Sequence, residues 1–114
     1  MVTVPQTDED WQRLHNSAVN HATSTNLLLI SGLPVASGST EEPAPAGELG
    51  PTAIAKLRNA NPQAWSAHAL LLHDVAIQAL HAIDNHDVDG LSEVGGDIDA
   101  ACESCHLQFW YPEG

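Results

Sequence analysis

The chain has two cysteines, and both lie in one short segment near its end, Cys102-Glu-Ser-Cys105-His106. The spacing C-x-x-C-H is that of covalent haem attachment: each thiol adds to a haem vinyl group as a thioether, and the adjacent histidine supplies an imidazole to the iron. On a helix, Cys102 and Cys105 lie on one face about a turn apart, and His106 lies one step round. The motif therefore predicts one covalent haem c, held by Cys102 and Cys105, with His106 as the proximal iron ligand.

Three other interpretations of the cysteine pair are weaker. A redox dithiol begins a helix that follows a strand, and no strand is indicated here. A zinc site needs further ligands, which the seven histidines would have to supply. A disulfide between cysteines three residues apart closes a trivial loop and stabilises little. The alternative function left open is a zinc- or dithiol-stabilised helical interaction module without haem.

The elements that must position the motif are all helical. Apolar residues recur at spacings of three and four, and no stretch alternates as a strand does. We expect helices over residues 8–30, 51–58, 62–85 and from 87 or 89 to about 109, with Thr7 or Asp8 and Asn61-Pro62 as start signals. The fold class is therefore all-α: a small antiparallel four-helix bundle with a short second helix, formed as a single domain over residues 1–114. Residues 34–51, rich in Pro and Gly, form a surface loop.

The predicted inward faces are rich in alanine, and aromatic residues make up 4% of the chain. Alanine buries little area, so each face contributes modest stabilisation. Small residues along two facing helices make room for a large flat cofactor, and they equally suit tight packing of helix against helix. The composition leaves both interpretations open.

The net charge excludes one class of partner. Three Lys and Arg against 15 Asp and Glu give −12 with His neutral, so no nucleic acid is expected to bind. A redox partner protein with a basic surface fits this charge. No apolar run is long enough to suggest a membrane span. Residues 1–10 are acidic and do not have the pattern of a signal peptide. Thioether attachment of haem takes place outside the cytoplasm, so we expect an exported, periplasmic protein whose signal segment is absent from this chain.

A C-x-x-C-H on the last helix of an α-bundle resembles the class II c-type cytochromes, the cytochrome c′ type. The resemblance covers the helix with Trp11 and Leu29, the helix with Trp65 and Ile83, and Cys102-x-x-Cys105-His106-x-x-Phe-Trp. The chain departs from that family in the middle, where a full-length second helix is replaced by residues 51–58.

The resemblance also implies which residues face the iron from the side opposite His106. Six-coordinate members present a Met from the first helix, and five-coordinate members present an apolar residue with an Arg one turn before it. Laying His15-Asn-Ser-Ala-Val19 over that pattern puts Val19 at the distal position and His15 at the Arg position. Val19 over the iron would leave it five-coordinate, whereas His15 as sixth ligand would give a bis-histidine haem. His21, on the other edge of the apolar face of the first helix, is a weaker candidate ligand, and the remaining histidines, His68 among them, are expected at the surface or the haem rim.

The function expected is that of a periplasmic mono-haem c-type cytochrome and not of an enzyme, so no catalytic residues are assigned. It would transfer one electron, bind a diatomic gas (NO or CO) at the His-ligated haem, or do both. The partners implied are the basic redox protein, the gas, and a second copy of the chain in a homodimer.

Overall fold

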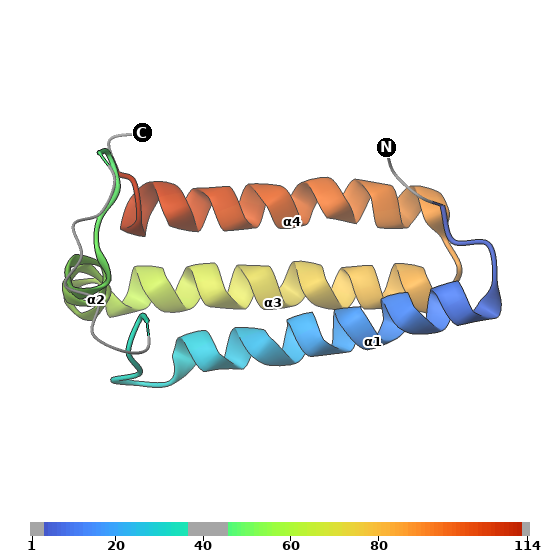
Figure 1. Ribbon diagram of the computed structural model, residues 1–114, viewed down its shortest axis with the longest axis horizontal. Helices are drawn as coiled ribbons and strands as arrows, with labels where there is room; N and C mark the ends of the chain where they lie inside the picture. The colour runs from blue at the N-terminus through green and yellow to red at the C-terminus, as the bar shows by residue number, and fades with distance from the viewer. Residues whose placement is uncertain (1–3, 37–45, 113–114) are drawn as a thin grey trace.

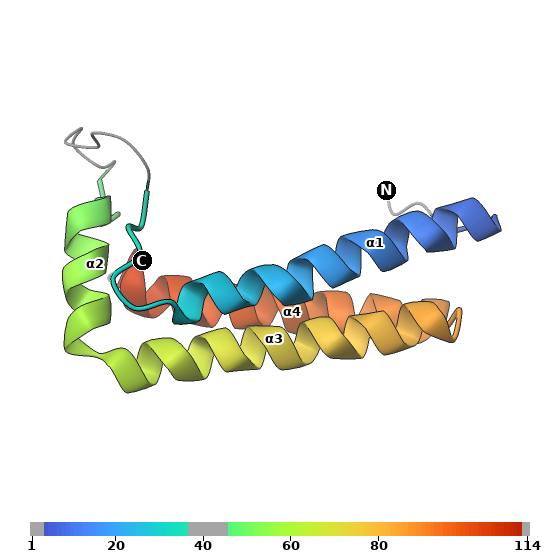
Figure 2. The ribbon, with the colours of Figure 1, turned by 90° about the horizontal axis from the view of Figure 1, so that it is seen from below.

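The computed structural model describes residues 4–36 and 46–112, and within these ranges every regular element is a helix. The order along the chain is α1 (Asp8–Ser24), the 3-10 helix η1 (Thr25–Leu29), α2 (Pro51–Ala60), α3 (Pro62–Asp84) and α4 (Val88–Phe109). The three long helices lie side by side, with α3 antiparallel to the other two (Figure 1). Short α2 lies across one end of this layer, roughly perpendicular to it (Figure 2). The prediction of an all-α bundle with a short second helix is confirmed.

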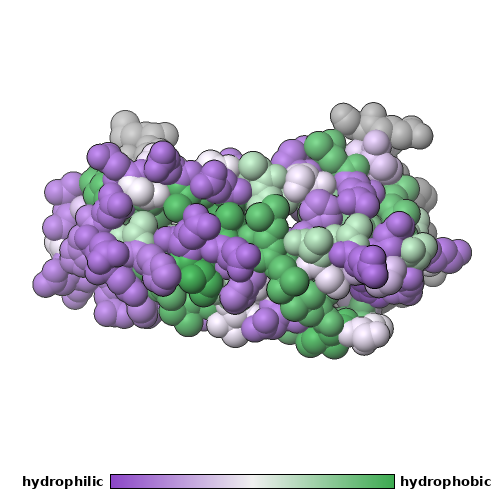
Figure 3. All heavy atoms as spheres, turned by 180° about the vertical axis from the view of Figure 1, so that it is seen from behind, coloured by the Kyte–Doolittle hydropathy of each residue, from purple (hydrophilic) through white to green (hydrophobic). Residues whose placement is uncertain are grey.

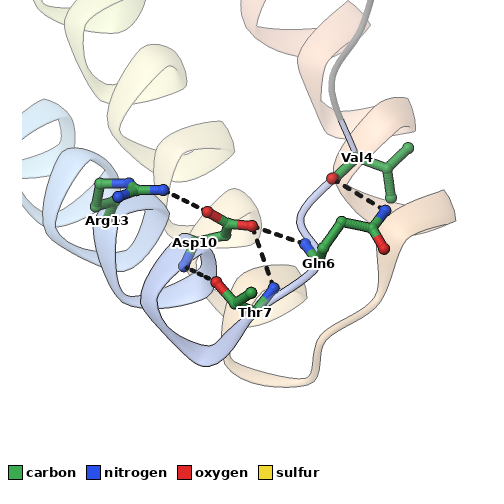
Figure 4. A network of polar contacts seen from close by, with 5 residues as sticks. All are labelled: Val4, Gln6, Thr7, Asp10 and Arg13. Atoms are coloured by element: carbon green, nitrogen blue, oxygen red, sulfur yellow. Dashed lines mark hydrogen bonds and ion pairs between the residues drawn. The ribbon is translucent and has the colours of Figure 1, made fainter.

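The start of α1 is fixed by a reciprocal cap (Figure 4). Thr7 Oγ1 accepts a hydrogen bond from the Asp10 amide at 3.1 Å, and Asp10 Oδ2 accepts from the amides of Gln6 at 2.9 Å and Thr7 at 3.1 Å. Asp10 also pairs with Arg13. The backbone amides of Gln6 and Thr7, followed by the Arg13 charge, hold the pKa of Asp10 below its usual value. This set of bonds explains why the helix begins where the sequence predicts.

The other helix starts also follow local signals. Pro51 and Pro62 occupy first positions of α2 and α3, where a missing N–H costs nothing. Asp87 caps α4 by accepting from the Gly90 amide at 2.9 Å. Asn61 differs from the expectation: its side chain donates to the Leu57 carbonyl at 2.9 Å instead of capping α3.

The first helix was expected to run to Ile30, but its α-helical part ends at Ser24. Ser24 Oγ donates to the Asn20 carbonyl at 2.6 Å and Thr25 Oγ1 to the Ala22 carbonyl at 2.7 Å. Hydroxyls that bond back to the preceding turn compete with regular helix geometry, and the chain tightens into η1 at this point. A turn follows with Gly32 at φ +77°, a conformation that favours glycine.

Alanine supplies much of the core. Six of the eleven buried apolar side chains among the described residues are Ala: Ala22, Ala69, Ala76, Ala79, Ala82 and Ala101. Small side chains let α3 approach both α1 and α4 closely, so alanine here does serve tight helix packing. The end of the bundle nearest α2 holds the large side chains Trp65 and Phe109, whose rings meet edge to face at 5.0 Å.

Helix α4 carries two adjacent glycines in its first half, Gly95 and Gly96, both exposed. A Cβ at either position would meet no atom within 4 Å, so close packing does not require glycine there. No helix within the described residues is long and apolar enough to cross a membrane.

Candidate functional site

A cavity of about 310 Å³ lies at the α2 end of the bundle, and it contains the whole C-x-x-C-H motif: Cys102, Cys105 and His106 line it together. Nine further lining side chains are apolar: Leu28, Val35, Ile54, Trp65, Ala69, Leu72, Ala101, Phe109 and Trp110. His68 completes the lining. A band of apolar side chains also crosses the half of the molecular surface nearer α2, seen from behind in Figure 3. The structure thus places the predicted chemistry in an apolar recess.

The two thiols lie one turn apart near the end of α4, both half-buried and neither in a disulfide. Burial, followed by the neighbouring Cys102, raises the pKa of the Cys105 thiol. Burial thus favours the neutral thiol over the thiolate at this position.

His106 is half-buried and lies among aromatic rings from the end of the chain. Trp110 meets it edge to face at 4.9 Å between ring centroids, and Tyr111 lies at 5.9 Å. The Tyr111 hydroxyl donates to Glu103 at 2.8 Å, and this hydrogen bond raises the pKa of Tyr111. The Leu49 amide donates to the Trp110 carbonyl at 2.7 Å, which ties the segment before α2 to the end of α4. Trp110 therefore forms part of the cavity wall beside His106.

Trp65 and Phe109 form the wall between α3 and α4. Phe109 is almost fully buried, at 2% exposed, and packs against the rings of both Trp65 and His68. Trp65 Nε1 donates to the Leu28 carbonyl at 2.7 Å, so the indole also fixes η1 against α3. Leu28, Val35 and Ile54 come from segments distant in sequence, and the helical periodicity of the chain gave no signal that they would meet the motif.

His68 shares the cavity with His106, but its ring nitrogens are both engaged by α4. Nε2 lies 2.7 Å from Gln108 Oε1, and Nδ1 lies 3.4 Å from Ser104 Oγ. The Ser104 hydroxyl also donates to the Ala101 carbonyl at 3.2 Å, so the firm hydrogen bond of this ring is the one between Nε2 and Gln108. His68 lies on the cavity wall, and its position relative to a haem stays a prediction.

The structure brings neither Val19 nor His15 to this cavity. Val19 is 39% exposed on α1. His15 Nδ1 lies 2.9 Å from Asp84 Oδ1, at the last residue of α3. Leu72 is the cavity residue of α3 nearest to Asp84, and twelve residues of helix separate the two by about 18 Å along the axis. His15 therefore lies near the opposite end of the bundle from the motif.

Among residues 4–36 and 46–112, no group of three or more His, Cys, Asp or Glu side chains is placed to hold a metal ion without further ligands. Comparison of the chain with protein-family models, curated proteins and solved structures found no match.

Proposed function

We propose that this chain is a mono-haem c-type cytochrome that binds a diatomic gas, transfers one electron, or does both. Cys102 and Cys105 would hold the haem as thioethers, and His106 would ligate the iron. When bound, the haem supplies an iron that changes oxidation state by one electron and binds small ligands. The observation that carries the proposal is that Cys102, Cys105 and His106 all line one apolar cavity.

The lining of the cavity suits a porphyrin. Ligand sites are mostly apolar with a few placed polar groups, and this one has nine apolar side chains around two thiols and two imidazoles. Its volume lies at the low end of the roughly 300–1,000 Å³ typical of such sites. A porphyrin is larger than this space, so one edge would extend past Leu28, Val35 and Trp110, each 37% exposed. An exposed edge is what electron exchange with a partner requires.

The apolar lining also favours five-coordinate iron. Beside the motif, the cavity is lined mostly by carbon side chains such as Ala69 and Leu72, and Nε2 of His68 is hydrogen-bonded to Gln108. Ligation by His15 would require this residue to leave Asp84 and move along the bundle. A vacant sixth position admits NO or CO, and this supports the gas-binding arm of the proposal.

The partner and the compartment are proposed on charge and chemistry. The net charge of −12 fits a redox partner with a basic surface. Because thioether attachment occurs outside the cytoplasm, we place the protein in the periplasm.

The test is production of the chain in a host that attaches haem covalently. We expect the purified protein to be red, with the mass of the polypeptide plus one haem and a high-spin ferric spectrum that changes when NO is added. His106→Ala should alter the spectrum, whereas His81→Ala, on an exposed side chain of α3 outside the cavity, should not.

Two outcomes would overturn parts of the proposal. A colourless protein with the bare polypeptide mass would leave the helical interaction module as the remaining function. A low-spin ferric spectrum that His15→Ala converts to high-spin would replace the gas-binding form with a bis-histidine electron carrier.

A further inference from the structure

A second cavity, of about 420 Å³, adjoins the first, and the two share Leu28 and Trp65 as walls. Its character is mixed, because polar side chains from the turn after η1, from α2 and from α3 line it together with the apolar Leu28, Leu29, Ile30, Pro62 and Trp65. The side chains with hydrogen-bonding groups in this lining are those of Ser31, Arg58, Asn59 and Ser66. An apolar recess holding the motif thus lies directly beside a more polar one.

Arg58 is the cation of this polar cavity. Its Nη1 donates to the Leu33 carbonyl at 2.7 Å, and its Nε donates to Asn59 Oδ1 at 3.2 Å. The guanidinium carbon lies 5.6 Å from the centre of the Trp65 ring, on the wall that separates the cavities. These hydrogen bonds use two of the five N–H donors of the guanidinium, and the others are available to a ligand.

The other two cations of the chain are placed differently. Arg13 pairs with Asp10 at the start of α1. Lys56 is exposed on α2 and lines neither of these two cavities. In a chain of net charge −12, a carboxylate bound at this end of the bundle meets a mostly negative surface, and Arg58 is the cation placed beside it.

We propose that Arg58 and the polar cavity form a carboxylate-binding subsite that receives the propionates of a haem attached to α4. This inference rests on the proposed function. The vinyl groups that form thioethers and the propionates lie on different edges of a porphyrin. With one edge fixed at Cys102 and Cys105, the carboxylates of the other edge need a polar region bordering the apolar cavity.

The chemistry of Arg58 suits this role. Its planar fork donates two parallel hydrogen bonds to a carboxylate, and charge-assisted bonds of this kind are about twice as strong as neutral ones. Because Trp65 and the Leu33 carbonyl already hold the guanidinium, little side-chain freedom is lost on binding. Arg58 is a positioning residue in this scheme, since it orients the cofactor without touching the iron.

The test compares Arg58→Gln with Lys56→Gln in the holoprotein. Each change removes one positive charge from the same helix, so their general electrostatic effects match. An unpaired propionate next to the iron stabilises the ferric state, so the midpoint potential of Arg58→Gln should fall by at least twice the shift in Lys56→Gln. Arg58→Lys keeps the charge but loses the planar fork, so its midpoint potential should lie between those of wild type and Arg58→Gln. Equal shifts in the two Gln variants would overturn the inference.

A structure of the wild-type holoprotein provides a test that does not depend on the variants folding. A propionate oxygen within hydrogen-bonding distance of the Arg58 guanidinium supports the subsite, and propionates directed away from the polar cavity overturn it. Either failure leaves haem attached at Cys102 and Cys105, whereas failure of the proposed function yields protein without haem. The mass of the purified protein therefore distinguishes failure of the carboxylate subsite from failure of the proposed function.

Discussion

Loss of the proposed haem should lower the free energy of unfolding of the bundle by an amount that can be calculated from the cavity volume. In Cys102→Ala/Cys105→Ala no thioether forms, and about 310 Å³ of apolar space is left unfilled. At about 24 cal/mol per Å³ of cavity, a sealed void of this size would cost about 7 kcal/mol. Leu28, Val35 and Trp110 are partly exposed, so solvent enters the mouth, and we take about half of this figure as the expected loss.

A loss of about 3.5 kcal/mol is a large part of the stability of a domain this size, which at about 0.05–0.15 kcal/mol per residue is roughly 6–17 kcal/mol. For a chain of 114 residues it corresponds to a fall in Tm of about 15 °C. The assay is thermal unfolding followed by circular dichroism of the helices, with the haem-bearing protein and the double variant measured in the same buffer.

The control is the unchanged sequence produced without haem attachment. Its Tm should lie within a few degrees of that of the double variant, because we attribute the destabilisation to loss of the cofactor and not to loss of two sulfur atoms. If the haem-bearing protein and the double variant melt together, the cofactor does not fill this cavity and the argument from its volume fails.

Four further predictions concern the cap of α1, which is tested twice, the cavity wall and the surface charge. Thr7→Ala should lower the free energy of unfolding by about 1 kcal/mol in urea titrations. Because the pKa of Asp10 is lowered by folding, its stabilisation is complete above its usual value of 3.8 and is lost as pH falls through the lowered value, so Asp10→Asn and wild type should converge in stability in acid. Ala69→Leu adds carbon atoms to the cavity wall and should stabilise the haem-free form by up to about 2 kcal/mol while reducing the haem content measured by absorbance. Ala79→Leu, at a position buried outside the cavity, should destabilise the protein by about 1–3 kcal/mol. Equal changes in stability in the two variants would show that the space beside Ala69 is no different from the packed core around Ala79. Electron exchange with a basic partner should slow as salt rises, and rates independent of ionic strength would contradict the role given to the −12 charge.

The sequence predicted helix boundaries well where a local signal marks them. Thr7, Pro51, Pro62 and Asp87 act through bonds or ring constraints within a few residues, so inspection of the chain finds them. The change from α1 to η1 was missed, because a helical wheel does not show that Ser24 and Thr25 bond back to the backbone.

The sequence also predicted the part of the site that the motif forms, because Cys102, Cys105 and His106 are neighbours on one helix. It did not predict the cavity residues that come from the other elements. Periodicity gives the direction in which a side chain points around its helix, but not its height along the partner helix. His15 was accordingly assigned to the site by its direction and lies beside Asp84 instead. Nothing local indicated that α2 lies across the end of the bundle and brings Ile54 and Arg58 to the cavities.

The adjacent glycines Gly95 and Gly96 are a weak point within α4, between its first two turns and the longer part that carries the C-x-x-C-H motif. Each glycine costs a helix about 1 kcal/mol relative to alanine, so hydrogen-bonded turns break most easily between Val94 and Asp97. Opening of the part that carries Cys102 and Cys105 would have to release the buried Ala101 and Phe109, and it would expose both thiols. If α4 opens in this way, amide hydrogen exchange should be faster in the residues after Gly96 than in those before Gly95. Replacing both glycines by alanine should slow the exchange of those residues.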